Sequence, residues 1–510
     1  MEHLLQFIKA LPAIWDSIPV SHQLMVYAVL SIGSILYILG QRRPPLATLS
    51  WSLAFLFMPV LGVTFYFLFG PRKLKRRNVR RELARHQAAH HGPHRHQQLP
   101  ETLASRHWLL SQARVATEYG CAPPRPVQKL EVLTDGDATY AAIEAAMQHA
   151  KHHIHVEYYI FRPDEVGTRW RDLLAGKARE GVKVRMLVDA VGSPHCSRKR
   201  FWQPLLEAGG EVRVFNPPRI VPFRPTMVNF RNHRKIVIID GHEGFTGGIN
   251  IDQIESAQCT GETAWRDTHL YVKGQAAQDL QRLFLEDWLY AGARFVHLAR
   301  LDKALTTPQD ILAWFPPQPE ETAGPPAEPT PWVQVIDSGP DRGEYPIYRF
   351  FFAAMSSARR RIWITTPYFI PDEAIMVALT TAAGRGVDVR LLVPMESDQL
   401  LTGLAASTFV EEVLARRVKV YAYVPRFIHA KTLVIDDELS VIGTANMDNR
   451  SFRLNFEVAA AIYDKKTTSE LARQFQKDLA SSTQLHADHQ PDSFNQRLVA
   501  SLARLAAPLL

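Results

Sequence analysis

The sequence predicts an α/β protein with two related lobes, each a sheet with helices on both faces, preceded by two apolar helices. Three observations support this prediction. A short pattern of reactive residues occurs twice, the strands and helices around it also occur twice, and two uncharged apolar stretches precede both copies. We expect the lobes to be related by a pseudo-twofold axis and to build one active site together.

The duplicated pattern is H-x-K-x4-D followed by an asparagine. The copies lie 196 residues apart, and in each copy the asparagine follows the histidine by 17 positions. One copy would carry little weight, but two copies with equal spacing on apolar β-like runs are hard to obtain by chance. The members of the two copies are His233, Lys235, Asp240, Asn250, His429, Lys431, Asp436 and Asn446.

These residue types suit the chemistry of a phosphodiester. One imidazole can attack the phosphorus and form a covalent phospho-histidine, and a second, protonated imidazole can give its proton to the leaving alkoxide. Lysines and asparagines can hold the non-bridging oxygens, where negative charge is stabilised in the transition state. A lysine two positions after a histidine on a strand shares its face. This scheme requires no metal and no cofactor.

The repeat extends beyond the motifs. In each copy an apolar run, a Pro-Asp-Glu turn, an Ala/Leu-rich helix, a glycine stop and another apolar run follow in this order, over 154–188 and 362–393. A proline-rich stretch over 316–331 separates the halves as a surface linker. The expected domains are a membrane anchor (1–71), a basic and histidine-rich linker (72–119), a first lobe (120–300), a proline-rich linker (301–331), a second lobe (332–485) and a C-terminal amphipathic helix (486–510).

Both copies carry wider sequence patterns of a known family. The first reads N-F-R-N-H-R-K-I-V-I-I-D-G over 229–241, and the second continues into G-T-A-N-M-D-N-R-S-F-R-L-N-F-E over 443–457. The chain resembles the phospholipase D superfamily and, within it, the bacterial cardiolipin synthases, over nearly its whole length. The R-S-F-x-L-N-F-E segment is the more specific marker. The chain departs from the family at Gly248 and Thr444, where serine is frequent, so we expect any phosphate contact at Gly248 to come from the backbone.

The resemblance implies two phospholipase D-like α/β/α lobes that share one active site. It also implies a phosphatidyltransferase, which converts two phosphatidylglycerol molecules into cardiolipin and glycerol through a phosphatidyl-histidine intermediate. By this analogy His233 is the expected nucleophile and His429 the acid and base. The remaining lysines and asparagines of the motifs, Lys235, Lys431, Asn250 and Asn446, form the expected phosphoryl clamp. Asp240 and Asp436 belong to the catalytic motifs, but a structural role in tying each motif turn to nearby backbone suits them better.

A nucleophilic imidazole needs a hydrogen-bond acceptor that holds its other nitrogen in one tautomer. Asp267 and Glu457, one strand beyond each motif, are the candidates for this supporting role. Glu157, Tyr159, Pro367 and Tyr368 end strands of the repeat and are candidates for lining the entrance.

Three other functions use the same residues. A phospholipase D would release phosphatidic acid by hydrolysis, a superfamily nuclease would cleave nucleic acid, and a membrane scaffold would carry an inactive site. The apolar N-terminus and the R-S-F-x-L-N-F-E segment favour transfer over hydrolysis. The two apolar stretches and the lack of a recognised nucleic-acid-binding module argue against a nuclease, and the intact duplicate motifs argue against an inactive scaffold. The motifs leave open whether phosphatidylglycerol, phosphatidylethanolamine or another alcohol is the second substrate, and they do not indicate the oligomeric state.

Two N-terminal stretches predict a membrane anchor, which the resemblance places in the bacterial cytoplasmic (inner) membrane. Residues 23–40 and 46–69 carry no charge and are long enough to span, with Pro59 as a candidate kink, and 41–45 can close a hairpin. The connector holds two arginines, whereas the segment after the second stretch holds seven basic residues. This bias places the lobes on the cytoplasmic side. The seven are Arg72, Lys73, Lys75, Arg76, Arg77, Arg80 and Arg81.

The composition agrees with an anionic partner, which we expect to be the phospholipid membrane and not nucleic acid. The net charge is +8 and the isoelectric point is about 9.3. The three cysteines have no disulfide or zinc spacing, and the histidine-rich run over 86–96 suits a polar linker better than a metal site. The C-terminal apolar face either packs on the second lobe or contacts lipid; its members are Phe494, Leu498, Val499, Leu502, Leu505 and Leu509.

Overall fold

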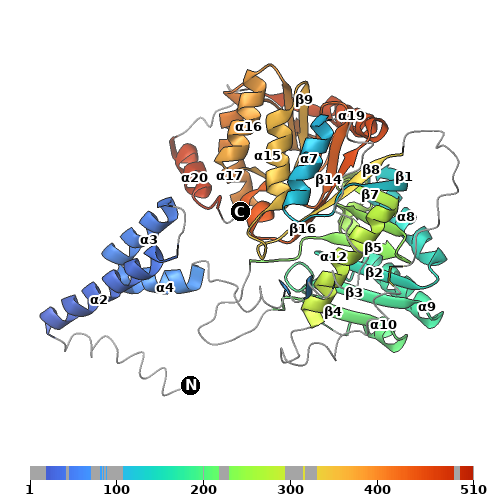
Figure 1. Ribbon diagram of the computed structural model, residues 1–510, viewed down its shortest axis with the longest axis horizontal. Helices are drawn as coiled ribbons and strands as arrows, with labels where there is room; N and C mark the ends of the chain where they lie inside the picture. The colour runs from blue at the N-terminus through green and yellow to red at the C-terminus, as the bar shows by residue number, and fades with distance from the viewer. Residues whose placement is uncertain are drawn as a thin grey trace. The chain divides into compact units, whose positions relative to one another are not determined.

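The computed structural model describes residues 19–41, 45–69, 81–82, 84–85, 88, 107–198, 200–217, 229–292, 314–315, 330–486 and 494–508. The chain divides into two compact units (Figure 1). The first contains Met1–Lys75 and Arg219–Thr226, and the second contains Arg76–Pro218 and Met227–Leu510. The N-terminal helices belong to the first unit, and both lobes belong to the second.

The two lobes form one continuous sheet of fifteen strands. Its halves join where β1 and β8 pair antiparallel, through Arg125 with Val333 and Pro126 with Trp332. The first half has the order β1 (Arg125–Leu133), β7 (His269–Gly274), β6 (Glu243–Gly247), β5 (Lys235–Ile239), β2 (His153–Tyr158), β3 (Lys183–Asp189), β4 (Glu211–Phe215). The second half has the order β8 (Trp332–Ser338), β16 (Glu457–Tyr463), β14 (Leu439–Gly443), β13 (Thr432–Ile435), β9 (Arg361–Thr365), β11 (Asp388–Pro394), β12 (Lys419–Tyr423), β17 (Ser482–Leu485).

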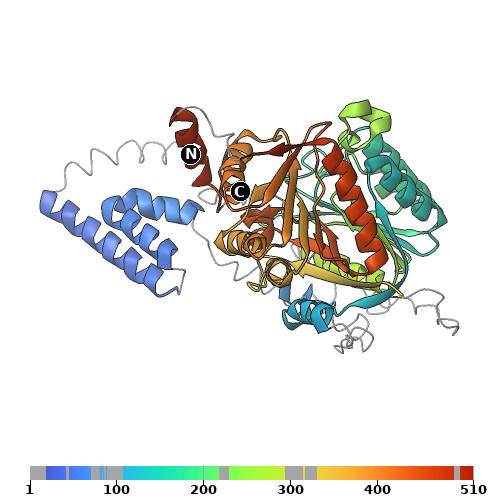
Figure 2. The ribbon, with the colours of Figure 1, turned by 90° about the horizontal axis from the view of Figure 1, so that it is seen from above.

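The two halves repeat the same topology strand by strand, apart from the additional β17. In each half the motif strand, β5 or β13, pairs antiparallel with the strand that opens the repeat, β2 or β9. Helices cover both faces, as Figures 1 and 2 show. This arrangement confirms the predicted α/β architecture with two related lobes.

The helices begin and end where the sequence signals predict. The Pro-Asp-Glu turns cap α9 and α16, because the carboxylates of Asp164 and Asp372 accept hydrogen bonds from backbone N–H groups of the first turn. Gly181 and Gly386 follow these helices with φ of +94° and +87°, a conformation that favours glycine. The first-lobe helices are α8 (Gly136–His149), α9 (Glu165–Arg179), α10 (Gln203–Glu207), α11 (Ala257–Thr260) and α12 (Gln275–Gly292). The second-lobe helices are α15 (Pro346–Ser357), α16 (Glu373–Gly384), α17 (Leu400–Leu414), α18 (Asn449–Arg453), α19 (Lys465–Ala480) and α20 (Phe494–Arg504).

The predicted linker over 72–119 is wrong in its last part. Residues His107–Glu118 form helix α7, which packs beside α15 of the second lobe (Figure 1). Trp108 Nε1 donates to Ser357 Oγ at 3.0 Å, and Gln334 Nε2 donates to the Ala113 carbonyl at 3.1 Å. Three apolar residues of α7 are buried, so this segment is part of the second lobe's core although it precedes the first lobe in sequence. The histidines of the 86–96 run lie outside the described residues.

Arg81, one of the seven basic residues that follow the second apolar stretch, lies in the protein interior. Its side chain is buried, forms an ion pair with Asp287 of α12 and a second with Asp341 at 3.3 Å, and covers the ring of Phe456. Two carboxylates and an aromatic face compensate the desolvation of the guanidinium, which a lipid surface would not need to do. Arg81 therefore belongs to the catalytic unit, and six basic residues remain in the membrane-proximal cluster.

The N-terminal unit contains helix α2 (Val20–Leu39), which is the one described helix long and apolar enough to cross a membrane. The second predicted span is not one helix, because the chain breaks into α3 (Pro45–Phe57) and α4 (Pro59–Phe69). Pro59 lacks a backbone N–H and disfavours helical geometry at Met58. The bend is sharp: a Cβ added at Gly62 would lie 2.7 Å from the Ala54 carbonyl oxygen.

Candidate active site

Each histidine motif lies beside a backbone segment of the other lobe. His233 precedes β5, and its N–H donates to the Phe456 carbonyl of the second lobe at 2.9 Å. His429 precedes β13, and its N–H donates to the Arg266 carbonyl of the first lobe at 2.7 Å. These cross-lobe contacts place the residue after each acceptor, Glu457 or Asp267, next to an imidazole.

The two supporting carboxylates are exchanged between the lobes. His233 Nδ1 lies 3.0 Å from Glu457 Oε2, and His429 Nδ1 lies 2.7 Å from Asp267 Oδ2. Each carboxylate fixes the proton of its imidazole on Nδ1, which leaves the lone pair of Nε2 for chemistry. Both Asp267 and Glu457 are fully buried, so water does not compete for these bonds. Either histidine thus depends on both lobes for its orientation.

The pKa values of both imidazoles are lowered. Burial lowers the pKa of His233, and burial together with the charge of Lys431 lowers the pKa of His429 to about 3. Both rings are therefore neutral at neutral pH, and the imidazole that acts as the acid must take up its proton when an anion binds. A bound phosphodiester would add a negative charge and raise the pKa of both rings.

The motif lysines meet in the same place. Lys235 and Lys431 are buried, and each donates to the carbonyl of its own motif histidine, Lys235 at 3.0 Å. Burial and the charge of Lys431 lower the pKa of Lys235 to about 7. Burial also lowers the pKa of Lys431, although Asp267 at 3.7 Å opposes the change. Two like charges in a dry site favour binding of an anion between them.

The predicted clamp asparagines are held by different partners in the two lobes. The backbone N–H of Asn250 donates to Glu255 Oε1, and that of Asn446 donates to Ser451 Oγ, each at 3.1 Å. The side-chain Oδ1 atoms of both asparagines have no partner among the described residues. Ser451 belongs to the R-S-F-x-L-N-F-E segment, so one task of this segment is to position Asn446.

Glu255 is a residue that the motif search missed. It lies 196 positions before Ser451, the same offset that separates the motifs, and the repeat alignment is the signal that could have found it. Burial and the charge of Asp267 raise the pKa of Glu255 to about 8, so it carries a proton at neutral pH. Its Oε2 atom is buried without a partner among the described residues. A neutral acid thus stands in the first lobe where the second has a hydroxyl.

The departures at Gly248 and Thr444 have a steric explanation. A Cβ added at Gly248 would lie 2.0 Å from Asp267 Oδ1, so a side chain there would displace the carboxylate that supports His429. Thr444, at the matching position of the second lobe, donates through Oγ1 to Glu457 Oε2 at 2.5 Å. The hydroxyl of Thr444 therefore supports a carboxylate and is not directed at a phosphate.

Asp240 and Asp436 do not belong among the catalytic side chains. Each follows the far end of its motif strand, with φ of +51° and +49°. Asp240 accepts from the backbone N–H groups of residues 151–153, and Asp436 from those of 359–361, at 2.7–3.2 Å. Three N–H donors hold each carboxylate at the turn, away from the imidazoles, so both residues act on the backbone.

The four residues that were expected to line the entrance lie in three different environments. The Tyr159 ring meets the His233 ring edge-on at 4.7 Å, and Trp265 lies 5.0 Å from the His429 ring. Glu157 is buried and accepts a hydrogen bond from Asn232, so it does not line an entrance. Pro367 and Tyr368 line an apolar pocket beside α17.

Three potential metal ligands lie close together at His429. Glu255, Asp267 and His429 each place one potential ligand atom within 4.8 Å of the others, but the charge of Lys431 next to Asp267 disfavours an added cation.

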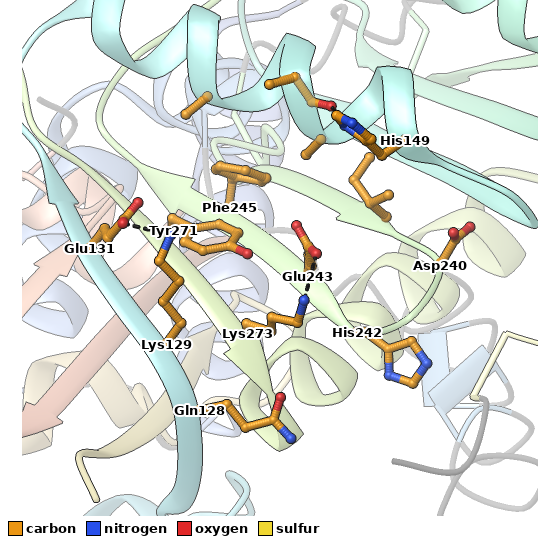
Figure 3. Close-up of a pocket in the computed structure, with 14 residues that line it drawn as sticks. Gln128, Lys129, Glu131, His149, Asp240, His242, Glu243, Phe245, Tyr271 and Lys273 are labelled. Atoms are coloured by element: carbon orange, nitrogen blue, oxygen red, sulfur yellow. Dashed lines mark hydrogen bonds and ion pairs between the residues drawn. The ribbon is translucent and has the colours of Figure 1, made fainter. Parts of the chain in front are cut away.

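A separate pocket of about 490 Å³ lies between α8 and strands β1, β6 and β7 (Figure 3). Its lysines pair with Glu131 and Glu243, and its lining includes none of the motif histidines or lysines. It is therefore not the candidate active site.

The chain is similar to known proteins over most of its length. The sequence matches the family described as "Cardiolipin synthase, PLD-like domain" over residues 143–288 and 351–479, and a "Phospholipase_D-nuclease N-terminal" family over 29–71. It is 39% identical over 483 residues to Cardiolipin synthase 2 of Bacillus cereus, covering 94% of this chain and 89% of that protein. It is 38% identical to the cardiolipin synthase of Geobacillus kaustophilus, covering 99% and 98% of the two chains.

A solved structure shares the fold. The phosphatidylserine synthase of Haemophilus influenzae superposes with a TM-score of 0.57 at 16% identity, covering 78% of this chain and all of that chain. This likeness concerns the fold alone, whereas the full-length sequence identity to cardiolipin synthases establishes the family. The chain belongs to the cardiolipin synthase family of phospholipase D-like enzymes.

Proposed function

We propose that this protein is a membrane-bound phosphatidyltransferase that makes cardiolipin and glycerol from two phosphatidylglycerol molecules. The observation that carries the proposal is the exchanged pair of supports, Glu457 on His233 and Asp267 on His429, around two buried lysines. One imidazole with a free Nε2 atom, and a second that takes up a proton on Nε2 when the anion binds, can act on opposite sides of one phosphorus. The cardiolipin synthase relatives supply the lipid class.

In the first step, His233 Nε2 attacks the phosphorus of one phosphatidylglycerol. The bond between phosphorus and the terminal glycerol oxygen breaks, and His429, which takes up a proton on Nε2 as the anionic lipid binds, donates that proton to this oxygen so that glycerol leaves. Lys235 and Lys431 stabilise the charge that develops on the non-bridging oxygens, together with the amide groups of the clamp asparagines. The phosphatidyl group stays on His233 as a phosphoramidate.

In the second step, a hydroxyl of another phosphatidylglycerol attacks the phosphorus. His429, now neutral, accepts the hydroxyl proton, the bond between phosphorus and His233 breaks, and cardiolipin leaves. Proton and charge balance because His429 regains the proton that it gave to glycerol. Transfer prevails over hydrolysis where water is scarce, and the histidine side chains are only 12% and 8% exposed.

The roles of the two histidines can be exchanged without moving any other residue. The alternative, with His429 as nucleophile, is favoured by the stronger lowering of its pKa, which keeps it neutral, while His233 is easier to protonate. Brief reaction with labelled phosphatidylglycerol and acid-free denaturation would trap the intermediate. Label retained on H429A and lost from H233A supports the assignment to His233, and the reverse pattern overturns it.

We further propose that α2 anchors the protein in the bacterial cytoplasmic membrane, with a second pass through α3 and α4 and the lobes in the cytoplasm. Six basic residues after α4 against two arginines before α3 support this orientation. A C-terminal reporter that fluoresces only when folded in the cytoplasm should be bright. A dark reporter with intact full-length protein would contradict the orientation.

The central experiment incubates the purified full-length protein with labelled phosphatidylglycerol alone. Cardiolipin and free glycerol in equal amounts are the expected products. Phosphatidic acid in place of cardiolipin would identify a hydrolase instead. Cardiolipin formation only after addition of phosphatidylethanolamine would change the second substrate but retain the transfer.

A further inference from the structure

Helix α20 packs on the second lobe through small residues. Ala500, Ala503 and Ala507, along and just beyond the helix, are buried. Arg504 holds the helix against α17, because its guanidinium lies 2.7 Å from Glu412 and 4.2 Å from the centre of the Phe409 ring. Alanines allow two helices to approach closely, so this face of α20 is already occupied by the protein.

The opposite face of α20 is left uncovered. Leu498, Val499, Leu502 and Leu505 are 47%, 48%, 57% and 77% exposed. They recur at helical spacing and form a continuous row, which we call the α20 apolar row. The sequence pattern placed Phe494 and Leu509 on the same face, but these side chains are not among those described. A row of this kind marks an interaction surface, whereas single exposed leucines are ordinary.

A second apolar feature stands at the start of the helix on which α20 packs. Leu400 and Leu401 open α17 and are 80% and 49% exposed. Another face of α17 lines a pocket of about 300 Å³ together with Pro367, Tyr368 and Phe369. Phe369 pairs through β10 (Phe369–Ile370) with Met447 of β15 (Met447–Asp448), the residue after clamp Asn446. Helix α17 thus contacts both α20 and β10, and the partner strand of β10 follows clamp Asn446.

The charges of the C-terminal segment indicate what binds to the α20 apolar row. From Ser493 to the C-terminus the only ionisable side chains are Arg497 and Arg504, and aspartate and glutamate are absent. A helix with leucine and valine on one face and no acidic side chain lies well at the boundary between head groups and acyl chains of an anionic bilayer. Anionic phospholipid is also the substrate class of the proposed function.

We propose that the α20 apolar row, with Leu400 and Leu401, inserts into the interface of an anionic phospholipid bilayer and holds the second lobe against the membrane. This inference rests on the proposed function for the identity of the lipid. It assigns both of the roles open to the C-terminal helix: its alanine face packs on the lobe and its leucine face contacts lipid. The anchor keeps the protein at the membrane, and α20 sets the orientation of the lobes on it.

The contact is tested with full-length protein in vesicles of phosphatidylglycerol and phosphatidylcholine. An environment-sensitive fluorophore is attached at L502C in a C259S background, since Cys121 and Cys196 are buried. E207C, an exposed site on α10, is the matched control. The L502C label should shift to the blue and be quenched by lipids with a nitroxide high on the acyl chain, while the E207C label does neither. A blue shift without quenching means that protein covers the row, and no shift means that water does; either result overturns the inference.

Activity supplies a second measurement. The L502E/L505E variant should lose about tenfold in kcat/KM on vesicle-borne phosphatidylglycerol, the loss expected for roughly 1.4 kcal/mol of contact. On the same lipid dispersed in detergent micelles it should match the wild type. Equal loss in both assays would overturn the inference. If the wild type makes no cardiolipin in either assay, the proposed function fails, while the quenching result still decides the membrane contact.

Discussion

His429 of the second lobe is supported by Asp267 of the first, at 2.7 Å between Nδ1 and Oδ2, and Glu457 returns the same contact to His233 at 3.0 Å. Neither lobe can therefore orient its own imidazole. The duplicated lobes are joined by one sheet through β1 and β8, and this junction brings the two supports into reach. The exchange explains why one polypeptide carries both copies in a fixed relation.

The first prediction concerns the two supporting carboxylates. D267N and E457Q should each lower kcat by about 10³- to 10⁴-fold, because an amide in place of a buried acceptor favours the wrong imidazole tautomer. The double variant should lose no more than about tenfold beyond either single variant, since the two imidazoles act as a unit. Kinetics on micellar phosphatidylglycerol measures this. D240N is the control for an acidic motif residue away from the imidazoles, and a loss as large as that of D267N would contradict the placement.

The second prediction concerns pH. Glu255, with a pKa raised to about 8, and Lys235, with a pKa lowered to about 7, both hold protons that favour an anionic substrate. As pH rises, loss of the lysine proton removes a positive charge and loss of the Glu255 proton adds a negative one. Above pH 8, log kcat/KM of the wild type should therefore fall with a slope steeper by one than that of E255Q, because only the wild type loses the Glu255 proton.

The same shift affects stability. The pKa of Glu255 is higher in the folded than in the unfolded chain, so the folded state binds more protons and loses stability as pH rises toward about 8. E255Q should unfold at a temperature that depends less on pH over this range. The titratable groups that face Glu255 are Asp267, Lys431, Asp252, Tyr140, Tyr158 and Lys235. Identical pH profiles for wild type and E255Q would contradict a protonated Glu255.

The third prediction concerns Gly248. G248A should lower kcat by at least about 100-fold, because the added Cβ lies 2.0 Å from Asp267 Oδ1 and must displace the support of His429. T444S, which keeps the hydroxyl at the matching position of the second lobe, should retain most activity. Steady-state kinetics on both variants checks this. Near wild-type activity in G248A would show that catalysis does not require Asp267 in its observed position.

The fourth prediction concerns Arg81. R81M leaves Asp287 buried without one of its partners and should destabilise the protein by about 3–5 kcal/mol. R85M is the matched control, because Arg85 shares the Asp341 partner at 2.5 Å but is 29% exposed, so its loss should cost less. Thermal unfolding in detergent measures both. Equal stability of R81M and wild type would place Arg81 outside the catalytic unit.

Arg81 also affects the site through its neighbours. Asp287 binds Arg234 at 2.6 Å, and Arg234 Nε donates to the Glu457 carbonyl at 3.2 Å. Under conditions in which R81M stays folded, its kcat should fall more than its affinity for lipid, because the Glu457 support shifts while the lysines stay in place. A change confined to KM would instead indicate a role in lipid binding.

Much of the fold and of the candidate site can be predicted from the spacing of residues along the chain. The two motifs, the Pro-Asp-Glu caps of α9 and α16, the glycine stops and the alternation of strand and helix are local patterns, so the sequence alone predicts them. The same reasoning proposed Asp267 and Glu457 as supports, because an imidazole needs an acceptor. It also predicted the fold class and the family.

Contacts between distant segments were decided only by the tertiary structure. Which carboxylate serves which histidine follows from the β1–β8 junction, which no short pattern encodes. The burial of Arg81 and the docking of α7 on the second lobe each depend on partners that are remote in the sequence, whereas Pro59 already indicated the bend between α3 and α4. Local spacing determines which side chains share a face of a helix or strand, whereas long-range packing determines which faces meet. The raised pKa of Glu255 depends on this long-range packing, because its burial and its neighbours come from distant segments.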